Sequence, residues 1–417
     1  MANILLCWEL GRALGHAGRL KSLALPLIAR GHSVSFVLRD LVHTRRQLAD
    51  VEVPKFQAPF WQHRVDGLPP GEASLADILL SCGWIDAGAV HGLVDGWRAL
   101  MRATRADLVV CDYAPAAVLA ARSLGIPSAA VGAGFTMPPA GQALPPLRDW
   151  EPVARERMAA SEARVLDSAN KVLAQHGAPP LAQACALLMG DLPLLCTWPE
   201  LDPWRRPAGG TRWHGPNVAP SPGVAPRWPA GAGPKVFAYL NGPHPEHGAM
   251  LAALQAAGCR TLCYLPEVAG GASPPYAAEG IAWARGPVDL GLALPECAFA
   301  VCHAGESTVS QALLAGRPLL LMPRTAESFL TARRVRELGA GINIDELARP
   351  LEWPAIVRSL LDDGRYAEAA QAFAQRHAGF DARLQAEALA DALEASASGT
   401  PRAQRFEDKE KLSARTW

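Results

Sequence analysis

The sequence has no net charge, no long apolar run and no cysteine framework. Lysine plus arginine and aspartate plus glutamate both number 40 among 417 residues, so no overall charge draws the chain to nucleic acid or to an acidic membrane. No charge-free apolar stretch reaches about eighteen residues, the minimum for a membrane-spanning helix. We therefore expect no nucleic-acid partner and no transmembrane segment, while peripheral membrane contact stays open.

The nine cysteines are scattered singly, and several lie in apolar runs where a thiol behaves as a small hydrophobe. Cys259 and Cys263 lack the second pair or nearby histidine that would complete a zinc pattern. An odd number of cysteines without a framework favours a reducing compartment. The N-terminal apolar run meets Glu9 too early for a signal peptide. These features predict a cytoplasmic protein.

What the sequence does contain is a repeated α/β rhythm, with 50% hydrophobic residues and a length that favours two domains. An apolar strand at 4–8 precedes a glycine-rich loop at 11–18, a helix at 20–29 and a strand at 34–38. The rhythm recurs at 107–131 and restarts at Lys235. This pattern predicts βαβ units with parallel sheets.

Prolines and glycines crowd residues 202–234 and make sustained regular structure improbable, apart from an ordered strand-edge segment near Arg212 to His214. We predict an α/β fold with two Rossmann-like domains facing a cleft, in which ligands bind at the strand C-termini. The predicted divisions are an N-terminal domain 1–201, a linker 202–234, a C-terminal domain 235–395 whose last helix is able to pack back on the N-terminal domain, and a flexible tail 396–417.

The strongest local pattern begins where a buried strand ends at Cys302 and His303 occupies its tip. Gly305 allows close backbone approach to a ligand, and Ser307 or Thr308 is a suitable N-cap for the helix that follows. Free N–H groups and the helix dipole at such a junction favour an anion, for example a diphosphate. The simpler alternative is a plain helix cap beside a structural histidine.

The longer pattern decides between these alternatives, because its spacing continues for more than twenty residues. It reads His303, Gly305, Ser307, Thr308, Gln311, Gly316, Pro318, Pro323, Glu327, Ser328. It resembles the donor-binding signature of inverting two-domain glycosyltransferases, which include the plant and macrolide UDP-glycosyltransferases and the MurG-like enzymes. The resemblance implies the GT-B architecture, a UDP- or dTDP-sugar donor, and no cofactor or metal.

The same resemblance implies that His303, Ser307 and Thr308 contact the donor phosphates and that Glu327 contacts the sugar hydroxyls. Gln311 stands where the family has a glutamate for the ribose, and Ser328 replaces a glutamine that reads the sugar. The implied donor-binding residues are Asn241, Gly242, Val288, His303, Gly305, Glu306, Ser307, Thr308, Gln311, Glu327 and Ser328.

In the N-terminal half, the resemblance places a Gly-His pair in the acceptor loop, where Gly15, His16 and Ala17 stand in this chain. A histidine near neutrality suits proton removal from an acceptor hydroxyl, and Asp112, at the end of another strand, would orient it. The alternatives are that His16 caps a helix or binds phosphate, and that Asp112 only caps the next helix.

Other histidines have no pattern around them and are interpreted as surface or structural: His32, His63, His91, His176, His214, His244, His247 and His377. Phe60, Trp61, Trp84 and Trp97 either line an apolar acceptor pocket or, as we favour, pack structurally.

The predicted reaction is a single displacement with inversion, in which His16 deprotonates a small-molecule or lipid acceptor. The helix tip after His303 meets the charge of the leaving nucleoside diphosphate. Three rivals are a nicotinamide dehydrogenase, for which the glycine spacing is wrong, a nucleotide-sugar epimerase and a non-catalytic nucleotide-sugar binder.

Overall fold

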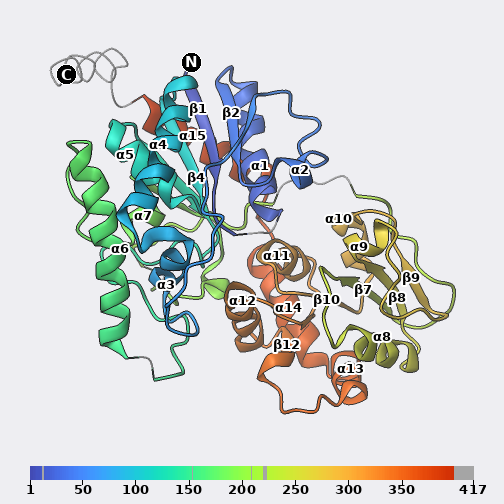
Figure 1. Ribbon diagram of the computed structural model, residues 1–417. Coiled ribbons are helices and arrows are strands. Elements are labelled where there is room, and N and C mark those ends of the chain that lie inside the picture. Colours follow the sequence, from blue (N-terminus) through green and yellow to red (C-terminus); the bar gives the residue numbers. More distant parts are fainter. Residues whose placement is uncertain (12–13, 153, 208, 219–222, 399–417) are drawn as a thin grey trace. The chain divides into compact units, whose positions relative to one another are not determined.

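The protein, analysed as a computed structural model, divides into two units. Its coordinates describe residues 1–417 except 12–13, 153, 208, 219–222 and 399–417. Unit 1 comprises Met1–Trp198, Arg206–Ala219 and the chain from Asp381, and unit 2 comprises Pro199–Arg205 and Pro220–Phe380. Each unit holds a six-stranded parallel sheet flanked by helices (Figure 1), which confirms the predicted pair of α/β domains.

The sheet of unit 1 has the strand order β3-β2-β1-β4-β5-β6, and every neighbouring pair is parallel. Its strands are β1 (Asn3–Trp8), β2 (Ser33–Leu38), β3 (Lys55–Gln57), β4 (Leu108–Asp112), β5 (Ser128–Gly132) and β6 (Leu192–Leu195). The chain runs outward from β1 to β3 and then returns to start again at β4. The carboxyl ends of β1 and β4 are therefore the switch point of this sheet, where doubly wound folds bind ligands.

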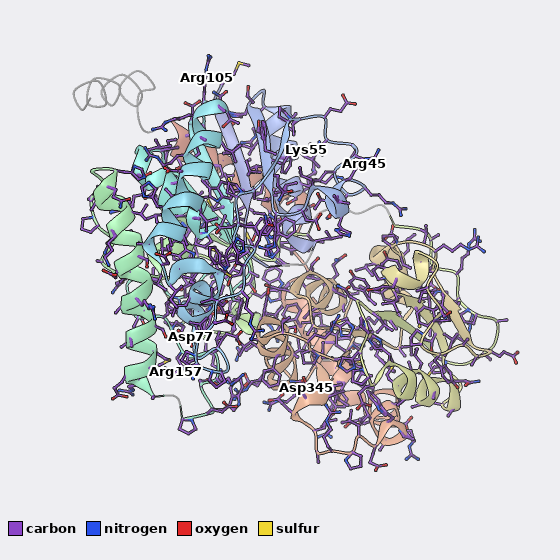
Figure 2. The ribbon with its side chains drawn as sticks, in the orientation of Figure 1. Arg45, Lys55, Asp77, Arg105, Arg157 and Asp345 are labelled. Atoms are coloured by element: carbon purple, nitrogen blue, oxygen red, sulfur yellow. The ribbon has the colours of Figure 1, made fainter. Side chains whose placement is uncertain are left out.

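Helices cover both faces of this sheet. They are α1 (Gly15–Ala29), α2 (Leu41–Thr44), α3 (Leu75–Leu79), α4 (Ala87–Ala103), α5 (Pro115–Leu124), α6 (Arg155–Gln175), α7 (Ala186–Met189) and α15 (Ala382–Ala397). The long helix α6 packs along α3 and α4 (Figure 1). Asp77 of α3 anchors this contact, since it faces Arg157 of α6 at 3.2 Å (Figure 2) and accepts a hydrogen bond from Ser161 Oγ at 2.5 Å.

Unit 2 repeats the design with the order β12-β11-β10-β7-β8-β9, again all parallel. Its strands are β7 (Lys235–Tyr239), β8 (Arg260–Tyr264), β9 (Ile281–Trp283), β10 (Phe299–Cys302), β11 (Leu319–Leu321) and β12 (Gly341–Asn343). Its helices are α8 (His247–Ala256), α9 (Pro266–Ala269), α10 (Leu290–Ala293), α11 (Glu306–Leu314), α12 (Ala326–Glu337), α13 (Trp353–Asp362) and α14 (Gly364–Arg376). The switch point here lies between β7 and β10.

The last helix belongs to unit 1 and not to unit 2. Leu389 and Leu393 of α15 share a buried core with Leu20 and Leu23 of α1, and Arg30 at the end of α1 pairs with Glu394 at 2.8 Å. The first two residues of the predicted tail 396–417 complete α15, and residues 399–417 lie outside the described residues.

The predicted linker 202–234 is divided between the two units and is not a free joint. The backbone N–H of His214 donates to the carbonyl of Leu195 in β6, as expected for an ordered strand-edge segment. The side chain of Gln385 donates to the carbonyls of His214 and Gly215 at 2.9 and 2.6 Å, which ties this proline-rich segment to α15.

In the described part of the chain, no single helix is long and apolar enough to cross a membrane. Leu75–Trp84 and Ala87–Ala103 meet the length and composition test only as a pair, and this pair is bent by 80°. Trp84 and Trp97 within it are fully buried, while Trp61 is partly exposed and packs over Gly83. Trp84 and Trp97 are thus core residues, which agrees with the structural interpretation favoured above.

Candidate functional site

The structure brings His16 and Asp112 together at the switch point of unit 1. Asp112 is the last residue of β4 and stands opposite Trp8, the last residue of β1. Helix α1 starts at Gly15, so His16 lies in the first turn of this helix. The sequence had predicted a loop at this position. The glycines at 15 and 18 did not prevent helix formation, because the following apolar face of α1 is buried in the core.

The histidine and the aspartate form a hydrogen-bonded dyad. His16 Nδ1 lies 2.9 Å from Asp112 Oδ1, and both side chains are buried. An ionised carboxylate only accepts hydrogen bonds, so Nδ1 carries the proton and Nε2 keeps its lone pair. A Cβ on Gly11 would stand 2.5 Å from this Nε2, and Gly11 has φ +77°. Glycine at position 11 therefore allows the backbone to approach the basic nitrogen of His16 closely.

Arg19 completes the dyad from one turn further along α1. Its Nη1 donates to Asp112 Oδ2 at 2.6 Å, so each carboxylate oxygen has its own partner. Burial alone would raise the pKa of Asp112, but the charges of Arg19 and His16 outweigh burial and lower this pKa. Asp112 is therefore an anion that holds the imidazole in one tautomer. Sequence reasoning missed Arg19, although its i+3 spacing from His16 was a signal.

Two residues of β1 and its exit support the dyad. The indole of Trp8 stacks on the ring of His16, with centroids 5.3 Å apart and planes at 20°. Glu9 accepts a hydrogen bond from the backbone of Ala116 at the start of α5. Burial raises the pKa of Glu9 to about 8, against the opposing effect of the backbone N–H groups of Ala116 and Ala117. Glu9 therefore binds a helix end, and nothing in its contacts gives it the role of the base.

The two neighbours of His16 in the predicted acceptor loop differ from each other. Gly15 opens α1 and has nothing within 4 Å of an added Cβ, so it borders open space. Ala17 is fully buried in the core of unit 1. The Ala17 side chain packs inward, because α1 begins two residues before it and buries this face of the helix.

The predicted donor residues gather at the switch point of unit 2. Asn241 and Gly242 follow β7, and His303 follows β10. Helix α11 starts at Glu306, and its N-cap residue Gly305 has no side chain to accept from the first N–H groups. The sequence predicted Ser307 or Thr308 as the N-cap. This prediction was wrong, because both residues lie inside the first turn of α11. An uncapped nine-residue helix presents N–H groups and a positive dipole end to an anion.

His303 belongs to a cluster of histidines that sequence reasoning missed. Its Nδ1 lies 2.6 Å from the carbonyl of Met322, and its Nε2 lies 3.3 Å from Nε2 of His247, the first residue of α8. The carbonyl only accepts, so Nδ1 of neutral His303 donates and its Nε2 accepts from His247. The ring of His244 lies 5.3 Å from His247 and 5.8 Å from His303 between centroids.

Burial keeps these imidazoles neutral. It lowers the pKa of His303 to about 4, although the Met322 carbonyl favours the charged form, and it lowers the pKa of His247 to about 3. The charge of Arg324 adds to both shifts. His244 also has a lowered pKa, mainly through burial. The cluster is therefore uncharged near neutral pH and lies beside the uncapped end of α11.

The side chain of Arg324 contacts the two residues Asn241 and Gly242 that follow β7. Its guanidinium donates to the carbonyl of Asn241. Gly242 has φ +65°, and any Cβ there would collide with the Arg324 guanidinium. Gly242 thus permits both the backbone turn and the close approach of an arginine, which adds a positive charge to the loop between β7 and α8.

Three residues predicted to bind the nucleotide-sugar donor, Ser328, Gln311 and Val288, contact other parts of the protein in the structure. Ser328 Oγ accepts from the N–H groups of Arg324 and Thr325, each at 2.9 Å, and Thr325 Oγ1 accepts from the Ser328 N–H. This capping box explains a serine where the family has a glutamine. Gln311 Nε2 donates to Ser307 O at 3.2 Å. Val288 is buried, and its neighbours in sequence bond with Val224.

The remaining predicted donor residues differ in exposure. Ser307 is exposed and Thr308 is buried, both in the first turn of α11. Glu306 is half-buried, and Glu327 is half-buried in the first turn of α12. Gly305 has nothing within 4 Å of an added Cβ. Gly305 and Ser307 are therefore the exposed residues at the start of α11.

The fold belongs to the class of two-domain GT-B glycosyltransferases. The structure of the glycotransferase of kitacinnamycin superposes with a TM-score of 0.68 at 19% identity and covers 95% of this chain and 98% of the other. The spinosyn rhamnosyltransferase SpnG, complexed with spinosyn aglycone, gives 0.66 at 20% identity over 94% and 100% of the two chains. VinC, in complex with dTDP, gives 0.62 at 17% identity over 95% and 100%.

More particularly, residues 283–383 match the model of the erythromycin biosynthesis protein CIII-like C-terminal domain. The curated relative that matches is the elloramycin glycosyltransferase ElmGT of Streptomyces olivaceus, 33% identical over 102 residues. The match covers 20% of this chain and 26% of ElmGT, so it spans about a quarter of the relative's length. The resemblance drawn from the sequence, to GT-B glycosyltransferases, is confirmed.

Proposed function

We propose that this protein transfers a sugar from a nucleoside-diphosphate sugar to the hydroxyl of a small molecule, with inversion at the anomeric carbon. The observation that carries the proposal is the buried His16–Asp112 dyad, in which Asp112 holds Nδ1 and Nε2 lies beside Gly11. A neutral imidazole oriented by a carboxylate is suited to remove a proton from an alcohol.

In the proposed reaction, His16 Nε2 takes the proton of the acceptor hydroxyl, and the acceptor oxygen forms a bond to the anomeric carbon of the donor. The bond from that carbon to the diphosphate breaks, and the nucleoside diphosphate leaves with the electron pair. Asp112 stabilises the imidazolium that forms, and Arg19 keeps Asp112 ionised. The oriented carboxylate limits the rotation of the imidazole, so the lone pair stays directed at the acceptor.

The leaving diphosphate is proposed to bind at the N-terminus of α11, beside His303. The N–H groups at the start of α11 and the Arg324 guanidinium supply hydrogen-bond donors and positive charge without a divalent metal, and the histidines add donors once the cluster takes up a proton. Turnover that persists in excess EDTA is the result expected from this assignment.

The donor base is proposed to be thymine, with UDP-sugars as the second choice. Support comes from VinC, solved in complex with dTDP, and from SpnG, solved with thymidine diphosphate. For the acceptor, the spinosyn aglycone bound to SpnG favours a small-molecule aglycone over a lipid. Lipid hydroxyls and vesicle binding are the alternatives to include in the same assays.

The test measures release of dTDP from a panel of dTDP-sugars and acceptors by wild-type protein and by His16→Ala and Asp112→Asn. General-base catalysis contributes about 10²–10⁴ in rate, so we expect His16→Ala to lower turnover by about this factor. Calorimetric binding of dTDP should be unchanged in both variants, because both residues belong to unit 1. Full activity in His16→Ala would refute the assigned base. Binding of dTDP without any turnover in the wild type would favour the non-catalytic binder.

A further inference from the structure

A second group of chemically active side chains lies on the helical layer of unit 1, and it shares no residue with the dyad. His91 and Asp95 stand four residues apart on α4, so they occupy the same face on successive turns. His176 is the C-cap residue of α6, which packs against α4. Two helices distant in sequence therefore present two imidazoles and one carboxylate to one point. The sequence offered no pattern around these histidines, because the contact between α4 and α6 that brings them together is not local.

The distances among these groups suit a small metal ion. His91 Nε2 lies 3.2 Å from Asp95 Oδ2, and His176 Nε2 lies 3.8 Å from Asp95 Oδ1. One ligand atom from each residue can be chosen so that all three lie within 4.8 Å of one another. Tetrahedral zinc, with bonds of about 2.0–2.1 Å to nitrogen and oxygen, needs ligand atoms about 3.4 Å apart. The separations of 3.2 and 3.8 Å between the histidine nitrogens and the Asp95 oxygens are close to that spacing, and the Asp95 side chain is 56% exposed.

A further observation points to a missing ligand. Nε2 of His176 is shielded from solvent and has no hydrogen-bond partner among the described residues. The whole His176 side chain is 14% exposed, and the exposed part does not include Nε2. A buried polar atom without a partner costs free energy, and a bound ion would satisfy it. The two histidine rings are in edge-on contact, with centroids 5.2 Å apart and planes at 69°.

We propose that His91, Asp95 and His176 bind one divalent transition-metal ion, with zinc as the best fit. Two imidazoles and a carboxylate are ligands that zinc accepts, and a water molecule would fill the fourth position. The ion joins α4 to α6 and stabilises unit 1, and it takes no part in sugar transfer. The nearby charges of Arg98 and Arg102 oppose a cation at His176. We therefore expect micromolar affinity and not the much tighter binding of structural zinc sites.

The test uses the full chain after chelator treatment and titrates it with zinc chloride by calorimetry. Variants are His91→Gln, His176→Gln and Asp95→Asn, and the matched control is His43→Gln. His43 pairs with Asp40 at 2.6 Å on the surface of the same unit, but the described residues provide no second imidazole there. We expect one zinc ion per wild-type chain, an affinity more than tenfold lower in each of the three site variants, and no change in the control.

Thermal unfolding gives a readout that does not depend on the heat of binding. At free zinc about a hundredfold above the dissociation constant, binding to the native state should raise Tm by about 5 °C, and the site variants should lose this rise. Asp95→Asn changes an exposed side chain and keeps the test valid if a histidine variant fails to fold. Absence of saturable zinc binding, or binding that is equally tight in all three site variants, would overturn the proposal. The second result would place the metal elsewhere, for example at His244, His247 and His303.

Discussion

His247 and His303 face each other through their Nε2 atoms at 3.3 Å, although they lie on different elements of unit 2 and 56 residues apart in sequence. The Met322 carbonyl fixes the tautomer of His303, so its Nε2 accepts from His247 and has no proton to give to a phosphate oxygen. A donor phosphate can therefore receive a hydrogen bond from this nitrogen only after the cluster takes up a proton.

Binding of dTDP should consequently take up protons from the buffer near pH 7. The imidazoles are neutral in the free protein because burial lowers the pKa of His303 to about 4 and of His247 to about 3, and a nearby dianion favours their charged forms. Calorimetry of dTDP binding in buffers with different ionisation enthalpies measures the uptake. His303→Asn should reduce it, and His43→Gln, a substitution in unit 1, should leave it unchanged. Identical binding enthalpies in all buffers would contradict the prediction.

The same pKa shifts predict a dependence of stability on pH. A histidine with a folded-state pKa of about 3 and an ordinary value of 6.5 binds more protons when unfolded between these values. His247 therefore contributes fully to the free energy of unfolding above pH 6.5. This contribution is lost as the pH falls from 6.5 towards about 3. Urea unfolding at a series of pH values should show a shallower acid loss for His247→Asn than for the wild type. Parallel curves for the two proteins would show that folding does not lower the pKa of His247.

Arg19 is predicted to position the dyad and not to bind substrate. Arg19→Gln removes the cation that keeps Asp112 ionised, so the imidazole is held less firmly and kcat should fall to a value between those of wild type and Asp112→Asn. KM for the donor should not change. Arg19→Lys should restore part of kcat, because an ammonium group keeps the charge but lacks the guanidinium geometry. A change in KM with unaltered kcat would assign Arg19 to substrate binding instead.

The variant Gly305→Ala tests whether Gly305 is needed for dTDP binding or for the stability of α11, because affinity and Tm are measured separately. Gly305 has φ −66°, which alanine adopts readily, and an added Cβ meets nothing within 4 Å, so Tm should be unchanged. The methyl group would project into the space where the phosphate is proposed to bind. Loss of one charge-assisted hydrogen bond there lowers dTDP affinity by about tenfold. Gly379→Ala, which also meets nothing within 4 Å, is the control and should change neither quantity. Unchanged dTDP affinity in Gly305→Ala would contradict the proposal that the diphosphate binds at the N-terminus of α11.

Features that depend on a short stretch of sequence were predicted correctly, and features that depend on packing were not. The αβ rhythm and the strand tips at Asp112 and His303 were predicted correctly, because apolar runs and glycine turns are local signals. The start of α1 was predicted too late, since burial of its apolar face extends the helix through Gly15 and His16. The role of Ser328 was also missed, because a capping box depends on where a helix begins, and α12 begins at Ala326.

The sequence by itself determined the class of the fold and the two positions, after β1 and after β10, where polar side chains interrupt buried strands. Only the tertiary structure decided which of those side chains meet. The order β2-β1-β4 places Asp112 against His16 and Arg19, and the order β10-β7 places His247 against His303. Strand order is set by the packing of whole βαβ units, a long-range property that no short stretch of sequence encodes.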